Sequence, residues 1–259
     1  MHNDIITIGR FTVHGYGLMI AIGIIAALIV ADRRAKKNGL SQDCVWSLAI
    51  WAILGGILGA KLLYIITDLK RVLSDPSSLL DFANGFVFYG CVIGGIAAIF
   101  IYCKVKKISF KAYLDLLMPS VALAQGFGRI GCFLAGCCYG KVTDSAFAVT
   151  FKHSELAPNN IPLIPTQLIM SGCDFILAAI LFIAAKKNKV EGRISSLYMI
   201  LYGIGRFAVE FLRGDPRGSV GALSTSQFIS VFIVAAGAVL YYISTKQSKK
   251  EESVPLSEK

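Results

Sequence analysis

ILYGIGRFAVEFLR, residues 200–213, is an apolar stretch that carries two arginines and a glutamate. A charged side chain at the centre of a bilayer costs roughly 2.5–3.5 kcal/mol on insertion scales, so it normally faces protein or a water-filled cavity. Tyr202, Arg206, Glu210 and Arg213 follow one another at helical spacing, which predicts one helix face turned away from lipid. Arginines in such a place indicate a bound anion, and the commonest anion of a membrane is a lipid phosphate.

The remainder of the chain is also apolar. Of its 259 residues, 55% are hydrophobic and only 16% are charged, whereas a soluble domain has about 25% charged residues. A membrane-spanning helix needs about 20 mostly apolar residues. Seven segments meet this requirement, at about 12–31, 45–66, 86–103, 112–127, 165–185, 194–212 and 225–243. The sequence therefore predicts an all-α, polytopic membrane protein with seven transmembrane helices.

The basic residues indicate how these helices are oriented. Lysine and arginine are concentrated in alternate connections and the C-terminal tail, near residues 33–37, 104–111, 186–193 and 246–259. Because cytoplasmic loops carry the excess of Lys and Arg, the N-terminus is predicted outside and the C-terminus in the cytoplasm. Residues 1–245 then form a single integral membrane domain, and 246–259 form a disordered cytoplasmic tail. The net charge of +10 indicates attraction to anionic membrane lipid and no nucleic-acid partner.

With that orientation, polar residues from several elements lie at one depth, toward the outer leaflet. They are His14, Tyr16, Tyr89, Arg129, Gln167, Arg206, Glu210 and Arg213. This agreement in depth predicts a single site, and Gly128 and Gly131 would let a ligand approach closely. Structural explanations stay open: an interior salt bridge between Arg206 and Glu210, an arginine that snorkels to headgroups, tyrosines of the aromatic belt, or a glutamine that cross-links helices.

The chain has seven cysteines, and three of them cluster in CFLAGCCYG, residues 132–140. On the predicted outer side disulfides persist, so Cys132, Cys137 and Cys138 are interpreted first as a structural disulfide or packed thiols. Metal binding and redox chemistry are the other two interpretations. No C-x-x-C pair is present, and histidine and acidic ligands are sparse, so no metal site is expected.

Several motifs resemble those of bacterial prolipoprotein diacylglyceryl transferases, in the same order and at similar spacing over nearly the whole chain. GRIGCFLAGCCYG (128–140) resembles the family signature G-R-x-G-N-F-x-N-x-E-x-x-G. FYGCVIG (88–94) is similar to F-H-G-G-L-I-G, and PTQL (165–168) is similar to P-[ST]-Q-L. YGIGRFAVEFLR (202–213) is similar to Y-G-x-x-R-F-x-x-E-x-x-R, and YGLM (16–19) resembles the motif of the first span.

The resemblance implies transfer of the diacylglyceryl group of phosphatidylglycerol to the lipobox cysteine thiol of a prolipoprotein, with release of glycerol phosphate. It implies a bacterial plasma-membrane enzyme that acts at the outer leaflet without a cofactor or metal. Guanidinium groups hold phosphate well, so they are expected to bind the leaving group. The expected catalytic residues are Arg129, Arg206, Glu210 and Tyr89. The expected substrate-binding residues are Tyr16, His14, Gln167, Tyr202, Arg213, Gly128 and Gly131.

The chain departs from the family pattern at positions associated with proton handling and donor positioning. Tyr89 stands where the family has histidine, and Cys132, Ala135 and Cys137 stand where it has two asparagines and a glutamate. The base that deprotonates the acceptor thiol is therefore unassigned, with Glu210 and His14 as candidates. Three other functions fit the sequence: a related transferase with a different acceptor, a protein that binds or transports anionic lipid without catalysis, and a membrane thiol oxidoreductase.

Overall fold

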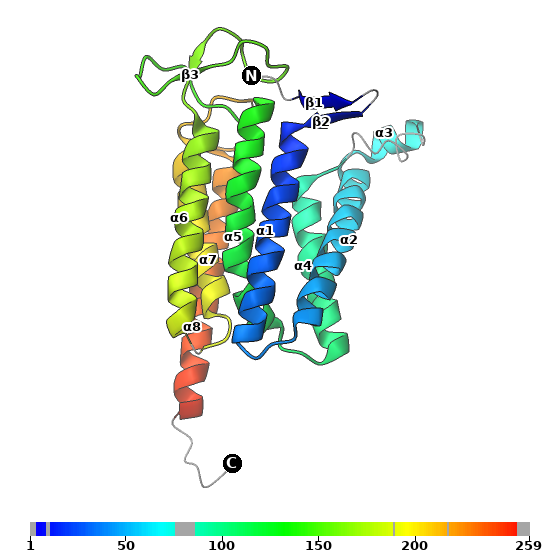
Figure 1. The fold of residues 1–259 in the computed structure, drawn as a ribbon, viewed down its shortest axis with the longest axis vertical. Coiled ribbons are helices and arrows are strands. Elements are labelled where there is room, and N and C mark those ends of the chain that lie inside the picture. Colours follow the sequence, from blue (N-terminus) through cyan, green and yellow to red (C-terminus); the bar gives the residue numbers. More distant parts are fainter. Residues whose placement is uncertain (1–3, 9–10, 76–85, 189, 217, 253–259) are drawn as a thin grey trace. The chain divides into compact units, whose positions relative to one another are not determined.

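The protein is mostly helical (Figure 1). The computed structural model describes residues 4–8, 11–75, 86–188, 190–216 and 218–252. The chain forms two compact units, Met1–Ala31 with Leu114–Lys259, and Asp32–Tyr113. The boundaries between the units fall within helices α1 (Gly15–Lys37) and α5 (Phe110–Ala135).

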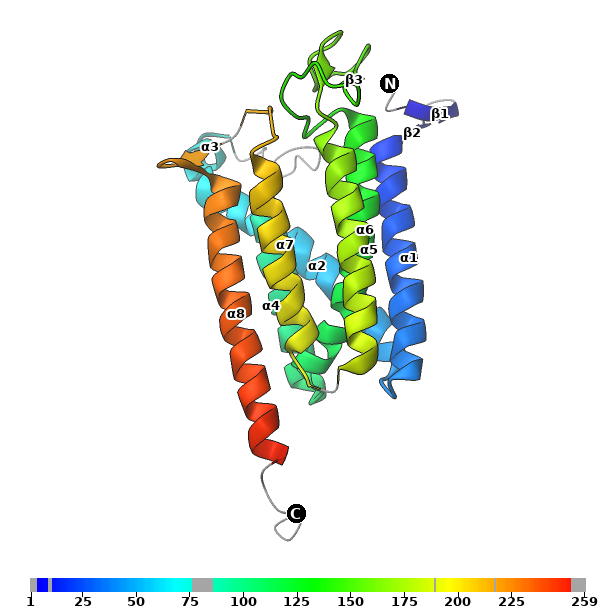
Figure 2. The same ribbon diagram turned by 90° about the vertical axis from the view of Figure 1, so that its left-hand side faces the viewer.

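The first unit contains most of α1 and α5 and three later helices, α6 (Thr166–Lys187), α7 (Arg193–Glu210) and α8 (Thr225–Glu252). Its described residues also form three short hairpins that the sequence did not predict. These are β1–β2 (Asp4–Ile8, Phe11–His14), β3–β4 (Val149–Thr150, Pro162–Leu163) and β5–β6 (Ser219–Val220, Leu223–Ser224). Figures 1 and 2 show that α1, α6 and α8 begin, and α5 and α7 end, at the end of this unit where the hairpins lie. We call this the hairpin end.

Small residues let the helices of the first unit approach closely. A Cβ on Gly131 of α5 would lie 3.1 Å from the carbonyl oxygen of Tyr16 in α1, and a Cβ on Gly126 would meet the ring of Phe175 in α6. The Ser171 hydroxyl of α6 also donates a 2.8 Å hydrogen bond to the Gly126 carbonyl. Backbones in direct contact through small residues are typical of helix packing in membranes, and they bring α1, α5 and α6 together around the hairpin end.

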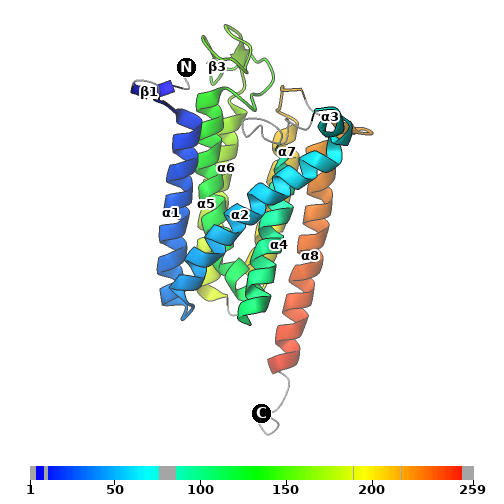
Figure 3. The same cartoon turned by 90° about the vertical axis from the view of Figure 1, so that its right-hand side faces the viewer.

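The second unit contains α2 (Gln42–Thr67), the short α3 (Leu69–Ser74) and α4 (Phe88–Lys106). Figure 3 shows α2 crossing α4 obliquely. The two helices meet through glycines, since a Cβ on Gly55 would lie 2.6 Å from the Gly94 carbonyl oxygen. A larger residue in place of these glycines would therefore push α2 and α4 apart.

In the part of the chain that the structure describes, six helices are long and apolar enough to cross a membrane, namely α1, α2, α4, α5, α6 and the part of α8 that ends at Ser248. They coincide with six of the seven predicted spans. The remaining span, 194–212, is helix α7, which does not belong to this group. It has 18 residues, a length of about 27 Å at 1.5 Å per residue, and it carries Arg206 and Glu210. The count of seven spans and the orientation stay predictions.

Helix α8 extends further than the sequence indicated. The predicted disordered tail begins at Lys246, whereas the helix continues to Glu252. Its last turns contain lysine, glutamine and glutamate, which are good helix formers. Residues 253–259 lie outside the described part of the chain, and the single-domain prediction stays a prediction.

Asp115, in the neighbouring helix α5, caps the N-terminus of α7. The N-cap of α7, Gly192, supplies no side-chain cap. Instead, the Asp115 carboxylate of α5 accepts hydrogen bonds from the Gly192 N–H (2.8 Å), the Ser195 N–H (2.7 Å) and the Ser195 hydroxyl (2.7 Å). A carboxylate at a helix N-terminus satisfies otherwise unpaired N–H groups and complements the helix dipole. Asp115 is therefore structural.

We expect Asp115→Ala to lower the free energy of unfolding by about 1–3 kcal/mol, because two helix N–H groups lose their acceptor. The measurement is thermal unfolding in detergent. Ser195→Ala is the matched control, since it removes one of the three hydrogen bonds and leaves the N–H groups paired. Equal stability of the Asp115→Ala protein and the unmodified protein would contradict this role.

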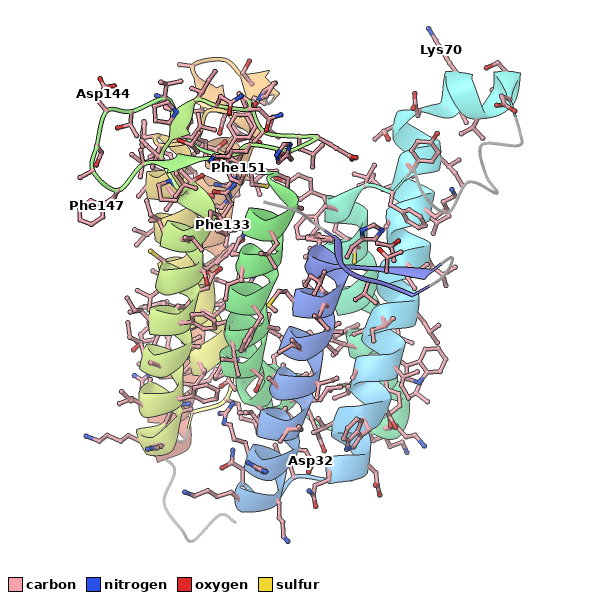
Figure 4. All side chains as sticks on the ribbon, turned by 45° about the horizontal axis from the view of Figure 1, so that its top comes forward. Asp32, Lys70, Phe133, Asp144, Phe147 and Phe151 are labelled. Carbon is pink, nitrogen blue, oxygen red and sulfur yellow. The ribbon has the colours of Figure 1, made fainter. Side chains whose placement is uncertain are left out.

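The segment between α5 and α6 folds over the hairpin end of the first unit. Its core consists of Phe133, Phe151, Ala157 and Leu163. The ring centroids of Phe133 and Phe151 are 5.8 Å apart, and Figure 4 shows the two residues near the end of α5. This small core includes Phe133, which lies between Cys132 and Cys137 in the chain, and it therefore anchors the cysteine segment.

Candidate functional site

Arg206 is held from two helices at the hairpin end of the first unit. Its Nη1 atom lies 2.6 Å from Glu210 Oε2, one turn further along α7, and its Nη2 donates a 2.8 Å hydrogen bond to the Ser226 hydroxyl of α8. The side chains of Arg206 and Glu210 are 10% and 4% exposed. The interior salt bridge considered from the sequence is therefore present, and Glu210 orients the guanidinium group.

Asp174 connects the two arginines that the sequence predicted to bind an anion. This residue of α6 is buried, and its carboxylate interacts electrostatically with both Arg129 and Arg206. Arg129, on α5, also interacts with Tyr202. Among the residues that the structure describes, the Oδ2 atom of Asp174 has no hydrogen-bond partner. Both guanidinium groups thus interact electrostatically with one carboxylate, and that carboxylate can still accept a proton or a hydrogen bond.

Sequence reasoning missed Asp174 although a signal was present. The residue is the only acidic one in the predicted span 165–185. An ionisable residue inside a span is a candidate for function by default, and the same argument singled out Arg206.

A cavity of about 280 Å³ lies between α6 and α7. Most of its lining is apolar, and Asp174, Tyr202 and Arg206 contribute the polar groups. Ile176 and Ile204, which also line it, are 62% and 53% exposed. An apolar cavity with a few convergent polar groups is the usual form of a small-molecule site, and this one suits a ligand with an apolar body and an anionic head.

The three clustered cysteines lie where α5 ends. Cys132 is in the last turn of α5, and Cys137 and Cys138 follow Gly136, whose φ of +74° turns the chain out of the helix. The three Sγ atoms all lie within 4.8 Å of one another, and all three cysteines are thiols without disulfides. Hydrogen bonds from Cys132 and Cys137, together with the nearby Arg213 guanidinium, lower the pKa of Cys138.

Arg213 has a different place from the one predicted. The sequence put it on the helix face of Arg206, but α7 ends at Glu210 and Arg213 lies beyond the helix, in a β-bridge with Gly140. Its Nε and Nη2 each donate a 2.8 Å hydrogen bond to the Asp215 carboxylate, and it also hydrogen-bonds Cys138. Arg213 therefore supports the cysteine cluster.

Gln167 and Tyr16 lie beside the same cluster. The buried Gln167 donates from Nε2 to the Cys137 carbonyl oxygen at 2.8 Å, so it cross-links α6 to the cysteine segment, as one of the structural explanations allowed. Tyr16, in the first turn of α1, interacts electrostatically with all three cysteines and with Arg129. Both residues are thus near the predicted site.

The remaining predicted residues occupy varied positions. Gly131 is a packing residue against α1, whereas a Cβ on Gly128 would meet nothing within 4 Å. His14 is exposed at the end of β2. Tyr89 lies in the first turn of α4, in the second unit, so its participation stays a prediction.

Together these residues can neutralise an anion and accept a proton. Two guanidinium groups provide the positive charge, and the buried carboxylate with which both interact lines the apolar cavity together with Arg206. In a dry site such groups interact far more strongly with a developing charge than they would in water. The fold and this site define a multi-pass membrane protein with a cationic centre beside an apolar cavity.

The chain belongs to the prolipoprotein diacylglyceryl transferase family, whose model matches residues 3–243. It is 54% identical to the phosphatidylglycerol–prolipoprotein diacylglyceryl transferase of Clostridium tetani (strain Massachusetts / E88), over 89% of this chain and 93% of the relative. It is 49% identical to transferase 2 of that name from Clostridium perfringens (strain 13 / Type A), over 92% and 94% of the two chains. A Finegoldia magna relative of the same name is 34% identical over 92% and 93%.

Proposed function

We propose that this protein transfers the diacylglyceryl group of phosphatidylglycerol to the lipobox cysteine thiol of a prolipoprotein and releases glycerol phosphate. The observation that carries the proposal is that Arg129 and Arg206 both interact electrostatically with Asp174, which lines the apolar cavity of α6 and α7 together with Arg206. Relatives named for this activity, at 54% and 49% identity, support it.

The two arginines act on the leaving group. When the acceptor sulfur attacks the glycerol carbon, the carbon–oxygen bond to phosphate breaks and the phosphate gains a second negative charge. Arg129 and Arg206 stabilise that charge, since both already interact with the Asp174 carboxylate. The lipid's acyl chains lie along the apolar side of the cavity, where Ile176 and Ile204 form an exposed edge.

The acceptor thiol must lose its proton before it attacks. Of the two bases considered from the sequence, Glu210 is engaged with Arg206 at 2.6 Å and His14 is exposed at the end of a strand. Asp174 fits better, because it is buried, lines the cavity and has an oxygen without a partner among the described residues. Asp174 is therefore the general base of the proposed mechanism.

Membrane topology follows from the same proposal. α7 is the sixth of seven spans, with its charged face toward α6 and α8, and the N-terminus is outside. The hairpin end then lies at the outer leaflet of the bacterial plasma membrane, where secreted prolipoproteins and phosphatidylglycerol are both accessible. The basic residues after α1, α4 and α6 support this orientation.

Complementation of a strain depleted of its own diacylglyceryl transferase tests the function. We expect growth to be restored, and we expect the purified protein to release glycerol phosphate from phosphatidylglycerol only when a lipobox peptide with cysteine is present. A peptide with serine at that position is the matched control. Binding of phosphatidylglycerol without release of glycerol phosphate would instead establish a lipid-binding or transport function.

A further inference from the structure

Three thiols, rather than two, converge at the hairpin end of α5. Their Sγ atoms all lie within 4.8 Å of one another. In a tetrahedral zinc site, two Zn–S bonds of about 2.3 Å place their sulfurs about 3.8 Å apart. A small decrease in the Sγ–Sγ distances would therefore bring all three sulfurs into ligand positions. A disulfide would use two of these sulfurs and leave the third. Sequence spacing alone predicts no metal site here, and the proximity of the three sulfurs is what the structure adds.

We propose that Cys132, Cys137 and Cys138 bind one Zn²⁺ ion, and that the acceptor cysteine thiol takes its fourth coordination position. This inference rests on the proposed transfer to a cysteine. Three protein ligands with one open position is the arrangement of catalytic zinc sites, and four sulfurs in a tetrahedron suit zinc.

The segment that carries the vicinal pair is held in place by its surroundings. Gln167 Nε2 donates to the Cys137 carbonyl, and the Thr166 hydroxyl donates to the Cys138 carbonyl, each at 2.8 Å. Cys138 has a φ of +63°, a conformation that residues other than glycine adopt uncommonly. The neighbouring Cys137 and Cys138 can thus both approach Cys132, and ligands fixed in advance favour metal binding.

The charges near the cluster match a zinc–thiolate centre. Three thiolates and one Zn²⁺ carry a net charge of −1. Arg129 interacts with Cys132 and Cys138, and Arg213 hydrogen-bonds Cys138. The two hydrogen bonds from Arg213 to Asp215 hold that guanidinium in position. Hydrogen bonds to a ligating sulfur from the surrounding shell orient the ligand and tune the metal.

One side of the cluster is open to an incoming peptide. Cys132 is buried, but Cys137 and Cys138 are only half-buried, and Tyr16 beside them is 42% exposed. A thiol that coordinates zinc is deprotonated outright. The metal would therefore hold the acceptor thiol as a thiolate at neutral pH. Such help matters in this chain because it has tyrosine at position 89, where the motif that it resembles has histidine.

The step balances in protons and charge. The acceptor thiol gives its proton to the Asp174 carboxylate and binds zinc as a thiolate. Its sulfur then attacks the glycerol carbon of phosphatidylglycerol, a C–S bond forms and the C–O bond to phosphate breaks. Glycerol phosphate leaves as a dianion, and the thioether product is neutral, so the total charge of −3, which includes the −1 of the zinc–thiolate centre, is unchanged and no redox partner is needed.

Metal analysis of the detergent-purified chain tests the site directly. We expect one zinc per chain in the unmodified protein and in Cys44→Ser, whose thiol lies outside the cluster. Cys132→Ser and Cys138→Ser should retain less than a tenth of that zinc. Protein stripped by a chelator, a test that needs no substitution, should bind one Co²⁺ per chain with a thiolate-to-cobalt charge-transfer band.

The cobalt form also tests the fourth ligand. A lipobox peptide with cysteine should change the cobalt spectrum, whereas the serine peptide should not. Absence of stoichiometric zinc from active protein, a disulfide within the cluster, copper or iron in place of zinc, or a cobalt spectrum that the cysteine peptide leaves unchanged would each overturn the proposal. The proposed transfer would survive all four results. Zinc in a protein that releases no glycerol phosphate would instead refute the transfer and leave the metal site standing.

Discussion

Arg206→Ala is expected to lower the rate of diacylglyceryl transfer by at least about 10²–10³-fold, the usual loss when one donor to a developing oxyanion is removed. The guanidinium lines the cavity and interacts with Asp174, where the leaving phosphate is placed in the proposed mechanism. Arg129→Ala should have an effect of similar size. Release of glycerol phosphate from phosphatidylglycerol vesicles, in the presence of a lipobox peptide, measures both.

Arg206 also stabilises the fold, so its loss needs two controls. Without it, Glu210 is left as a buried carboxylate, which is strongly destabilising. Arg206→Lys keeps the positive charge but not the planar fork of donors, and we expect it to recover only part of the activity. Arg193→Ala removes an arginine at the opposite end of the same helix, where it packs on Tyr241, and should leave transfer unchanged. Full activity of folded Arg206→Ala protein would remove the phosphate-binding role.

The length of the apolar segments predicted most helices of this chain well, because segments of about 20 apolar residues have few alternatives in a membrane. Six predicted spans match helices of sufficient length and hydropathy. The three hairpins were missed, since strands such as Val149–Thr150 are too short to show any alternation. The end of α8 was misplaced because a charged, polar segment with good helix formers resembles a disordered tail.

The site was predicted only in part, because sequence spacing indicates contacts within one helix but not contacts between helices. Helical spacing correctly paired Arg206 with Glu210, but it extended the helix to Arg213, which follows the helix end at Glu210. Contacts between helices, such as that of Asp174 with Arg129, depend on rotation of each helix about its axis, which a single span does not reveal. The thiol cluster likewise depends on the turn after Gly136, which spacing alone does not fix.

Asp174→Asn is expected to slow transfer by about 10²–10⁴-fold at neutral pH, the range for loss of a general base. The amide has the shape of the carboxylate but takes up no proton. The acceptor thiol must then lose its proton to solvent, so the rate of the variant should rise with pH up to the pKa of that thiol, which is about 8.5 for a free cysteine and lower for one bound to the proposed zinc. The pH profile of transfer between neutral and mildly alkaline conditions measures this recovery.

A purely structural Asp174 would behave differently. If its carboxylate only positions the two guanidinium groups, Asp174→Asn should weaken phosphatidylglycerol binding and show no recovery at higher pH. If it is the base, removing a negative charge beside the phosphate should leave lipid binding intact or strengthen it, because Arg129 and Arg206 then lose a competing anion. Asp174→Glu, which keeps an ionisable group in the same cavity, should retain more activity than the amide at neutral pH. A lipid-binding assay run beside the pH profile separates the two roles, since they predict opposite changes in affinity.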